Sequence, residues 1–163
     1  MAKWSMDIEK LVGKREADIK KVRKAYAFAL YSSIVQKTPV GHPDFDKDSG
    51  RARGNWNVSV GQPDPTVTMQ KTPKYQSPKA LPDPNGDEPI YISNNLPYIT
   101  TLEYGGYPNP PKKGSHTRKG IKPPRTEIFS KNGFSRQAPE GMVGVTIANK
   151  DNIFEAVVRG IVK

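Results

Sequence analysis

The sequence predicts an α+β fold: a long N-terminal helix, a small antiparallel sheet with long Pro/Gly-rich loops, a short helix and a C-terminal helix. Two observations predict it. A long apolar stripe of helical period precedes Pro39, and two short segments further on alternate apolar and polar residues. With 163 residues the chain fits one domain, 1–163. Its 16 Pro and 14 Gly indicate a modest core with extended loops, at about 62–89 and 106–137.

The first element expected is a helix over residues 5–36, where steps of three and four join the apolar positions. Ser5 or Asp7 can cap its start, and Pro39 ends it because the residue before a proline avoids the helical region. The other side of this helix carries a basic row, made up of Arg15, Lys20, Lys21, Arg23 and Lys24. The row is interpreted as a solvated face, with a seam against DNA or an acidic neighbour as the alternative.

Two strands are expected after a loop at 38–54. In the first, Trp56, Val58 and Val60 alternate with polar residues, which is typical of a half-buried strand. The second covers residues 90–93. Between them, residues 62–89 hold seven Pro and read as a loop or an arm, in which Val67 and Met69 mark a short strand at most.

A short helix is expected from Pro97 to Tyr104, since proline suits a first helical turn and Gly105 suits the position after the last. Four tyrosines crowd around this helix and the second strand: Tyr91, Tyr98, Tyr104 and Tyr107. They are interpreted as core residues, with Tyr107 the one expected to be exposed.

The last segment, 139–163, permits two interpretations. Val143, Val145 and Ile147 alternate like a strand, but the length without internal proline favours a helix from about 140 to 160. Pro139 would then stand in the first turn, although Gly141 and Gly144 weaken the helix.

The net charge is +10, from 26 Lys and Arg against 16 Asp and Glu. Such a charge suits nucleic acid, a membrane surface or an acidic protein face. Residues 106–137 alone hold eight Lys and Arg against one acid. The basic residues that face a partner or DNA are expected among Lys112, Lys113, Arg118, Lys119, Lys122 and Arg125. No aromatic residue stands among them, so contact with the duplex backbone is the most they promise, and a loop ordering against a protein partner is favoured.

Several functional classes find no support. Without Cys the chain has no disulfide framework and no thiolate zinc site, and it lacks a signal peptide and a membrane helix, so a soluble protein made in the cytosol is expected. No G-x-S-x-G, H-E-x-x-H or phosphate-binding glycine loop occurs. We therefore expect no enzyme and no cofactor.

One cluster resembles a metal site at first. His42, Asp44, Asp46 and Asp48 begin like a calcium loop, but glycine comes one position late at Gly50, and Asn55 stands where a bidentate Glu is needed. The cluster is interpreted as a polar, turn-rich loop, and a metal-dependent hydrolase is a remote third function.

Several short motifs can be read together in order. They are Thr38-Pro39-Val40, Gly50-Arg51-x-Arg53, Asn55-Trp56, Asn94, Tyr98, Leu102-Glu103-Tyr104-Gly105 and Pro139-x-Gly141-Met142-Val143. Over nearly the whole chain they resemble the small neck or tail-completion proteins of tailed bacteriophages. That family is typified by a T-P-V-D-T-G-R-L-R turn, an N-x-x-x-Y-x-x-x-L-E-Y-G segment and a P-x-G-M-V opening near the C-terminus. Here GHPDFDKDS replaces the short D-T, so the acidic loop is an insertion without a role in the family pattern.

The resemblance implies a single α+β neck or tail-completion domain and a non-enzymatic virion structural protein. It implies a homo-oligomeric ring at the neck or tail end. The ring would contact head-closure or connector proteins, and tail tube or tail terminator proteins. Contact with the sugar-phosphate backbone of passing DNA is also expected, and contact with a membrane is not. The expected location is the virion, after assembly in the host cytoplasm. The alternative is a small basic nucleic-acid-binding protein.

Elementary chemistry suggests roles for some motif residues. Trp56 is the expected core anchor, and Gly50 the expected site of a dihedral that other residues resist. Arg51 and Arg53 are expected to pair with Glu103 or with a neighbour's carboxylate. The loops at 62–89 and 106–137 are expected to reach onto neighbouring subunits.

Overall fold

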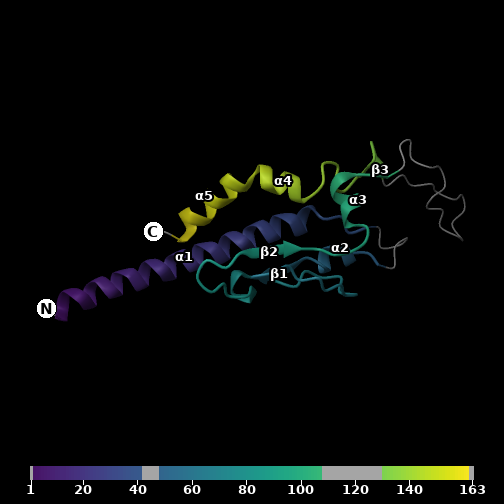
Figure 1. Ribbon diagram of the computed structural model, residues 1–163. Coiled ribbons are helices and arrows are strands. Elements are labelled where there is room, and N and C mark those ends of the chain that lie inside the picture. Colours follow the sequence, from purple (N-terminus) through teal and green to yellow (C-terminus); the bar gives the residue numbers. More distant parts are fainter. Residues whose placement is uncertain (1, 42–47, 108–129, 162–163) are drawn as a thin grey trace, which may run out of the picture.

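The protein is described from a computed structural model, which covers residues 2–41, 48–107 and 130–161, with side chains from Val12 onward. Its elements, in order, are α1 (Ala2–Lys37), α2 (Arg51–Gly54), β1 (Asn57–Val60), η1 (Pro78–Ala80), β2 (Ile90–Ser93), α3 (Ile99–Tyr104), β3 (Ser130–Lys131), β4 (Phe134–Ser135), α4 (Val143–Ala148) and α5 (Lys150–Ile161). The predicted α+β class is confirmed. Figure 1 shows α1 as the spine, with β1 and β2 along one side and α4 and α5 along the other.

The long helix α1 starts at Ala2, about a turn earlier than predicted, and ends at Lys37 before the Thr-Pro pair. Its C-terminal half is the packed half, where Tyr31, Ile34 and Val35 are buried. Its N-terminal turns extend beyond every other described element (Figure 1). Packing therefore stabilises only part of this helix, because a helical segment gains most of its stability from a buried face.

The two central strands pair antiparallel, with Val58 opposite Ile92. The prediction of a half-buried strand is wrong at Asn57, on the polar face of β1, because this residue is only 4% exposed. Its amide donates to the carbonyl of Thr66, so the following segment covers that face. The Tyr75 hydroxyl donates to the Val58 carbonyl at 3.0 Å and thereby satisfies the edge of β1 that does not face β2.

Residues 62–89 form a loop packed on their own chain and not a free arm, whereas contact of this loop with neighbouring subunits stays a prediction. They fold back on α1 and β1, with only the short η1 as regular structure and no strand at Val67 and Met69. Polar side chains hold them in place. The Arg23 guanidinium donates to the carbonyls of Gly86 and Glu88.

The basic row of α1 is therefore only partly solvated, which corrects the interpretation of that face. The Lys24 ammonium lies 2.9 Å from an Asp83 carboxylate oxygen, and the Lys20 ammonium lies 3.9 Å from the same oxygen. The hydrogen bond from Lys24 lowers the pKa of Asp83 below its ordinary value, and the positive charge of Lys24 contributes a smaller lowering. Three of the five cations thus hold the 81–88 turn against the helix.

The core lies between the C-terminal half of α1 and the elements on both sides of it. Trp56 is 4% exposed, which confirms its role as a core anchor. Tyr31 and Tyr75 meet edge to face with ring centroids 5.3 Å apart, and burial raises the pKa of the Tyr31 hydroxyl. The buried apolar residues are Ala27, Tyr31, Ile34, Val35, Ala52, Trp56, Val58, Tyr75, Leu81, Leu96, Leu102, Ala138 and Met142.

The C-terminal region is helical, but not as one helix from 140 to 160. Pro139 lies outside any helix and Gly141 has φ +78°, a left-handed value that no α-helix contains, so α4 starts only at Val143. A break at Asn149 separates α4 from α5. The pair runs antiparallel to α1, because the Thr146 and Ser33 hydroxyls meet at 3.1 Å near its end. The Phe154 and Tyr26 rings meet further back, at 5.2 Å.

A small hairpin lies in the tract 106–137, which was predicted to be irregular throughout. Strands β3 and β4 pair antiparallel around Asn132 and Gly133. Both turn residues have positive φ, 53° and 83°, as a type I′ turn requires. The turn's carbonyl also accepts the backbone N–H of Tyr107, which ties the hairpin to the end of α3.

Candidate functional site: the junction of the sequence motifs

The Thr38-Pro39-Val40 and Asn55-Trp56 motifs meet at the end of α1. The fully buried Thr38 hydroxyl donates to the Ile34 carbonyl at 2.7 Å and accepts the indole N–H of Trp56 at 2.8 Å. The Arg53 guanidinium donates to the carbonyls of Thr38 and Gln36 at 2.7 and 3.1 Å. A cation at this position also suits the negative end of the helix dipole. Thr38, Arg53 and Trp56 therefore act together to close the long helix.

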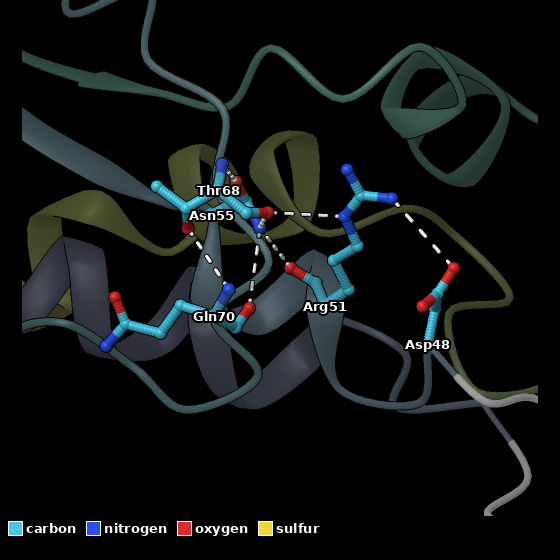
Figure 2. A network of polar contacts seen from close by, with 5 residues as sticks. All are labelled: Asp48, Arg51, Asn55, Thr68 and Gln70. Carbon is cyan, nitrogen blue, oxygen red and sulfur yellow. Dashed lines mark hydrogen bonds and ion pairs between the residues drawn. The ribbon is translucent and has the colours of Figure 1, made fainter.

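Asn55 forms the centre of a polar network, shown in Figure 2, that fixes the segment after β1. Its Nδ2 donates to the carbonyls of Arg51 at 2.8 Å, Thr68 at 3.1 Å and Gln70 at 3.5 Å. Its Oδ1 accepts the backbone N–H of Thr68 at 2.6 Å. The side-chain amide thus replaces a neighbouring strand, pairing with both the N–H and the C=O of one residue.

Two glycines allow the backbone to come this close. Gly50 has φ +86°, which confirms the expected unusual dihedral, and an added Cβ would lie 2.8 Å from the Lys71 carbonyl oxygen. At Gly54 an added Cβ would lie only 2.1 Å from the Gln70 carbonyl oxygen. The two glycines of the G-R-A-R-G motif therefore allow the backbone of residues 70 and 71 to pack directly against α2.

The expected pairing of Arg51 and Arg53 with Glu103 is wrong within this chain. The Arg51 guanidinium donates to the Thr68 carbonyl at 3.2 Å and lies 3.9 Å from the Asp48 carboxylate (Figure 2). Both arginines mainly bind backbone carbonyls of their own surroundings. Of the two partners expected for these arginines, a carboxylate of a neighbouring subunit stays a prediction.

The remaining turn motifs also serve to connect elements. The Val40 N–H donates to the Gln137 side chain at 2.7 Å, which links the turn after α1 to the hairpin region. The Asn94 amide donates to the Ala52 carbonyl at 2.9 Å and joins the end of β2 to α2. Pro39 is buried beside Thr38.

The tyrosines divide differently from the prediction. Tyr104, at the end of α3, is 77% exposed, and Tyr98 is 39% exposed. Tyr107 instead packs against the core, so its expected exposure is wrong, and burial raises its pKa. Gly105 has φ +81° and brings the chain against the Gly133 carbonyl and the Phe134 ring.

The Leu-Glu-Tyr-Gly and Pro-x-Gly-Met-Val motifs meet through one carboxylate. Glu103 Oε2 accepts the N–H groups of Met142 and Val143, and Oε1 accepts that of Gly144, each at 2.8 Å. These are the donors that the first turn of a helix leaves unsatisfied. Gly141 is needed here, because an added Cβ would lie 2.4 Å from the Glu103 carbonyl oxygen. Met142 is then fully buried in the core.

We expect Glu103→Gln to lower the free energy of unfolding by about 1–3 kcal/mol, measured by urea denaturation. The amide removes the charge and places an N–H donor opposite at least one of three backbone donors. Glu140→Gln is the matched control, because Glu140 is exposed and makes the same change beside the same motif. Equal stability of the two variants would show that the cap carries no weight.

Some predicted site residues lie outside the described residues. They are His42, Asp44 and Asp46 of the acidic insertion, and Lys112, Lys113, Arg118, Lys119, Lys122 and Arg125 of the basic tract. Across 12–41, 48–107 and 130–161, no three His, Asp or Glu side chains gather as a metal site would require. Over the same ranges no helix is long and apolar enough to cross a membrane.

Exposed apolar side chains on the helices are the feature that the motifs did not reveal. Val12 and Ile19 of α1 are 49% and 61% exposed, and Ile147 and Phe154 of the C-terminal helices are 54% and 44% exposed. A signal for this exists in the lengths: α1 has 36 residues and α5 only 12, so the apolar stripe of α1 outruns its cover.

No family model, curated protein or solved structure matches the chain. Its motifs and its surface thus provide the basis for assigning a function.

Proposed function

We propose that the chain is a non-enzymatic structural protein of a tailed-bacteriophage virion. In this proposal it acts in head–tail joining or tail completion, as one subunit of a ring-shaped neck assembly. The order and spacing of its motifs, which resemble those of neck and tail-completion proteins, are the basis. The observation that supports it most is that distant motifs meet in pairs, Thr38 with Trp56 and Glu103 with Met142. Residues that jointly build one fold are what a real family likeness requires, whereas a chance likeness does not require them to touch.

The partners follow from this proposed position at the neck or tail end of the virion. They are further copies of the chain, a head-closure or connector protein on one side, and a tail tube or tail terminator protein on the other. The net charge of +10 suits acidic neighbours or non-specific contact with the backbone of passing DNA. The protein would assemble in the host cytoplasm and remain in the virion.

A small basic nucleic-acid-binding protein is the second candidate, favoured by the same net charge. The structure weakens one of its supports. Arg23 and Lys24 bind the turn that contains Asp83, Gly86 and Glu88, so this part of the basic row is occupied within the chain. Phosphate contacts would then come mainly from cations elsewhere.

Mass and shape of the purified full-length chain test the proposal, by light scattering and negative-stain imaging at low and high concentration. Isolated phage tails and capsids are added in a parallel series. We expect rings of one mass, or a monomer that forms rings only on tails. A monomer that ignores tails and capsids but binds duplex DNA at moderate salt would overturn the proposal and support the second candidate.

A further inference from the structure

The N-terminal half of α1 continues a face that is covered further along the same helix. Val12, Ile19 and Tyr26 are spaced by seven residues and so lie on one side of the helix. At Tyr26 this side is covered by the Phe154 ring of α5. At Ile19 and Val12 it is exposed. With about 54 Å of helix in α1 and about 18 Å in α5, the chain's own helix cannot cover the whole stripe.

A cation lies in the middle of this uncovered stripe. Arg15 follows Val12 by three residues and precedes Ile19 by four, so the three side chains form one patch. Arg15 is exposed, and no ion pair within the described part of the chain includes it. The occupant that fits is a helix that carries a carboxylate with one apolar residue on each side of it.

The α4–α5 pair presents that pattern in reverse. Ile147 is 54% exposed, and Phe154, which also contacts Tyr26 of its own chain, is still 44% exposed. Asp151 lies four residues after Ile147 and three before Phe154. Its carboxylate side chain is 86% exposed, and the ammonium of the adjacent Lys150 lies 3.6 Å from it. The Ile153 N–H donates to the Asn149 carbonyl, which keeps nearly helical spacing across the break. An antiparallel approach would place Asp151 opposite Arg15 and the apolar residues opposite one another.

We propose that the uncovered half of α1 in one copy docks antiparallel on the α4–α5 surface of a second copy, through Val12, Arg15 and Ile19 against Phe154, Asp151 and Ile147. The chain's own α5 already lies beside Tyr26, so the contact joins different copies. It is heterologous, head to tail, and such contacts build closed rings when the rotation closes. The inference deepens the proposed ring assembly and rests on it.

Charge reversal on each side tests the contact. Arg15→Glu places two carboxylates opposite each other, and Asp151→Lys places two cations opposite each other. We expect each variant alone to self-associate at least about tenfold more weakly than the unmodified chain, measured by sedimentation velocity over a concentration series. Lys14→Glu is the matched control, since Lys14 is exposed but lies about 100° around the helix from Arg15. It should associate as the unmodified chain does.

Mixing the two variants gives the decisive result. In an equimolar mixture, Glu at 15 of one variant faces Lys at 151 of the other, and the unmodified Arg15 and Asp151 face each other at the alternate contact. We expect assembly to return in the mixture and in the double variant. All three proteins carry exposed changes, so circular dichroism and melting should match the unmodified chain.

Two results would overturn the inference, and they differ in what they say of the ring. Rings that form equally in both single variants leave the proposed function intact but place the contact elsewhere. An unmodified chain that stays monomeric at every concentration also removes this contact, and the tail-addition series then decides separately on the proposed function.

Discussion

Gly54→Ala is expected to lower the free energy of unfolding by about 3 kcal/mol or more, because the added methyl group has no room. Its Cβ would lie 2.1 Å from the Gln70 carbonyl oxygen, 2.5 Å from the carbonyl carbon and 2.9 Å from the Lys71 nitrogen. All three atoms belong to the backbone, so no side-chain rotation can relieve the overlap. The change must push residues 70 and 71 away from α2, and that movement breaks the hydrogen bonds of Asn55.

Gly13→Ala is the control for this prediction. Gly13 lies in the exposed half of α1, and an added Cβ would meet nothing within 4 Å. Alanine is a better helix former than glycine by up to about 1 kcal/mol, so the stability should stay unchanged or rise slightly. Urea denaturation of both variants separates the two effects. If Gly54→Ala is as stable as Gly13→Ala, the close approach of α2 and residues 70–71 is not needed for the fold.

The sequence predicts those parts of the fold that have a regular apolar period. The stripe of α1, the alternation at Val58 and Val60, and the pair at Ile90 and Ile92 follow from burial of one face of a helix or strand. The two strands also pair antiparallel, as the prediction of a small antiparallel sheet requires. Periodicity works here because hydrophobic burial dominates the local choice.

Residues 62–89 show where this reasoning fails. Their anchors are polar: the amides of Asn55 and Asn57, the hydroxyl of Tyr75, and the cations Arg23 and Lys24. Apart from Tyr75, these anchoring residues lie outside the segment. The sequence of the segment itself therefore contains no spacing that would mark it as ordered. A proline-rich segment held by partners up to 65 residues away reads as an arm when only its own composition is considered.

The C-terminal helix and the hairpin fail for different reasons. Gly141 takes a left-handed conformation because the chain passes within contact of the Glu103 backbone, and no local pattern specifies that contact. The hairpin carries a usable signal, since Asn132-Gly133 is a strong type I′ turn pair. Its strands have two residues each, too short for any alternation to be read.

The candidate site divides in the same way. The motif residues Thr38, Asn55, Trp56 and Glu103 were found from the sequence, but their partners were not, because side-chain to backbone bonds leave no sequence period. The charge pattern of the helix predicts a solvated face for Arg15, although its apolar neighbours Val12 and Ile19 lie beside it and are exposed.

The second large effect is expected for Asn55→Asp, which keeps the shape of the side chain and changes its charge. At 1% exposure the new carboxylate would face the carbonyl oxygens of Arg51, Thr68 and Gln70, where the amide now donates. Burying a charge against acceptors, with the loss of these hydrogen bonds, should cost about 3 kcal/mol or more in the free energy of unfolding at pH 7. The nearby Arg51 guanidinium offsets only part of this, since it is already bound to the Thr68 carbonyl.

The pH dependence distinguishes the cost of a buried charge from the cost of losing the hydrogen bonds that the amide donates. Burial beside acceptors raises the pKa of the new carboxyl in the folded state above its unfolded value of about 3.9. The unfolded chain then loses its proton first, so the penalty grows as the pH rises from the unfolded value to the folded value and is constant above it. Urea denaturation should therefore show a smaller gap to the unmodified chain at pH 4 than at pH 7. Asn132→Asp, exposed and in a turn that tolerates either residue, should show little gap at either pH. A gap for Asn55→Asp that does not change with pH would mean that the lost hydrogen bonds of the amide, and not a buried charge, destabilise the variant, and the predicted charge penalty would be wrong.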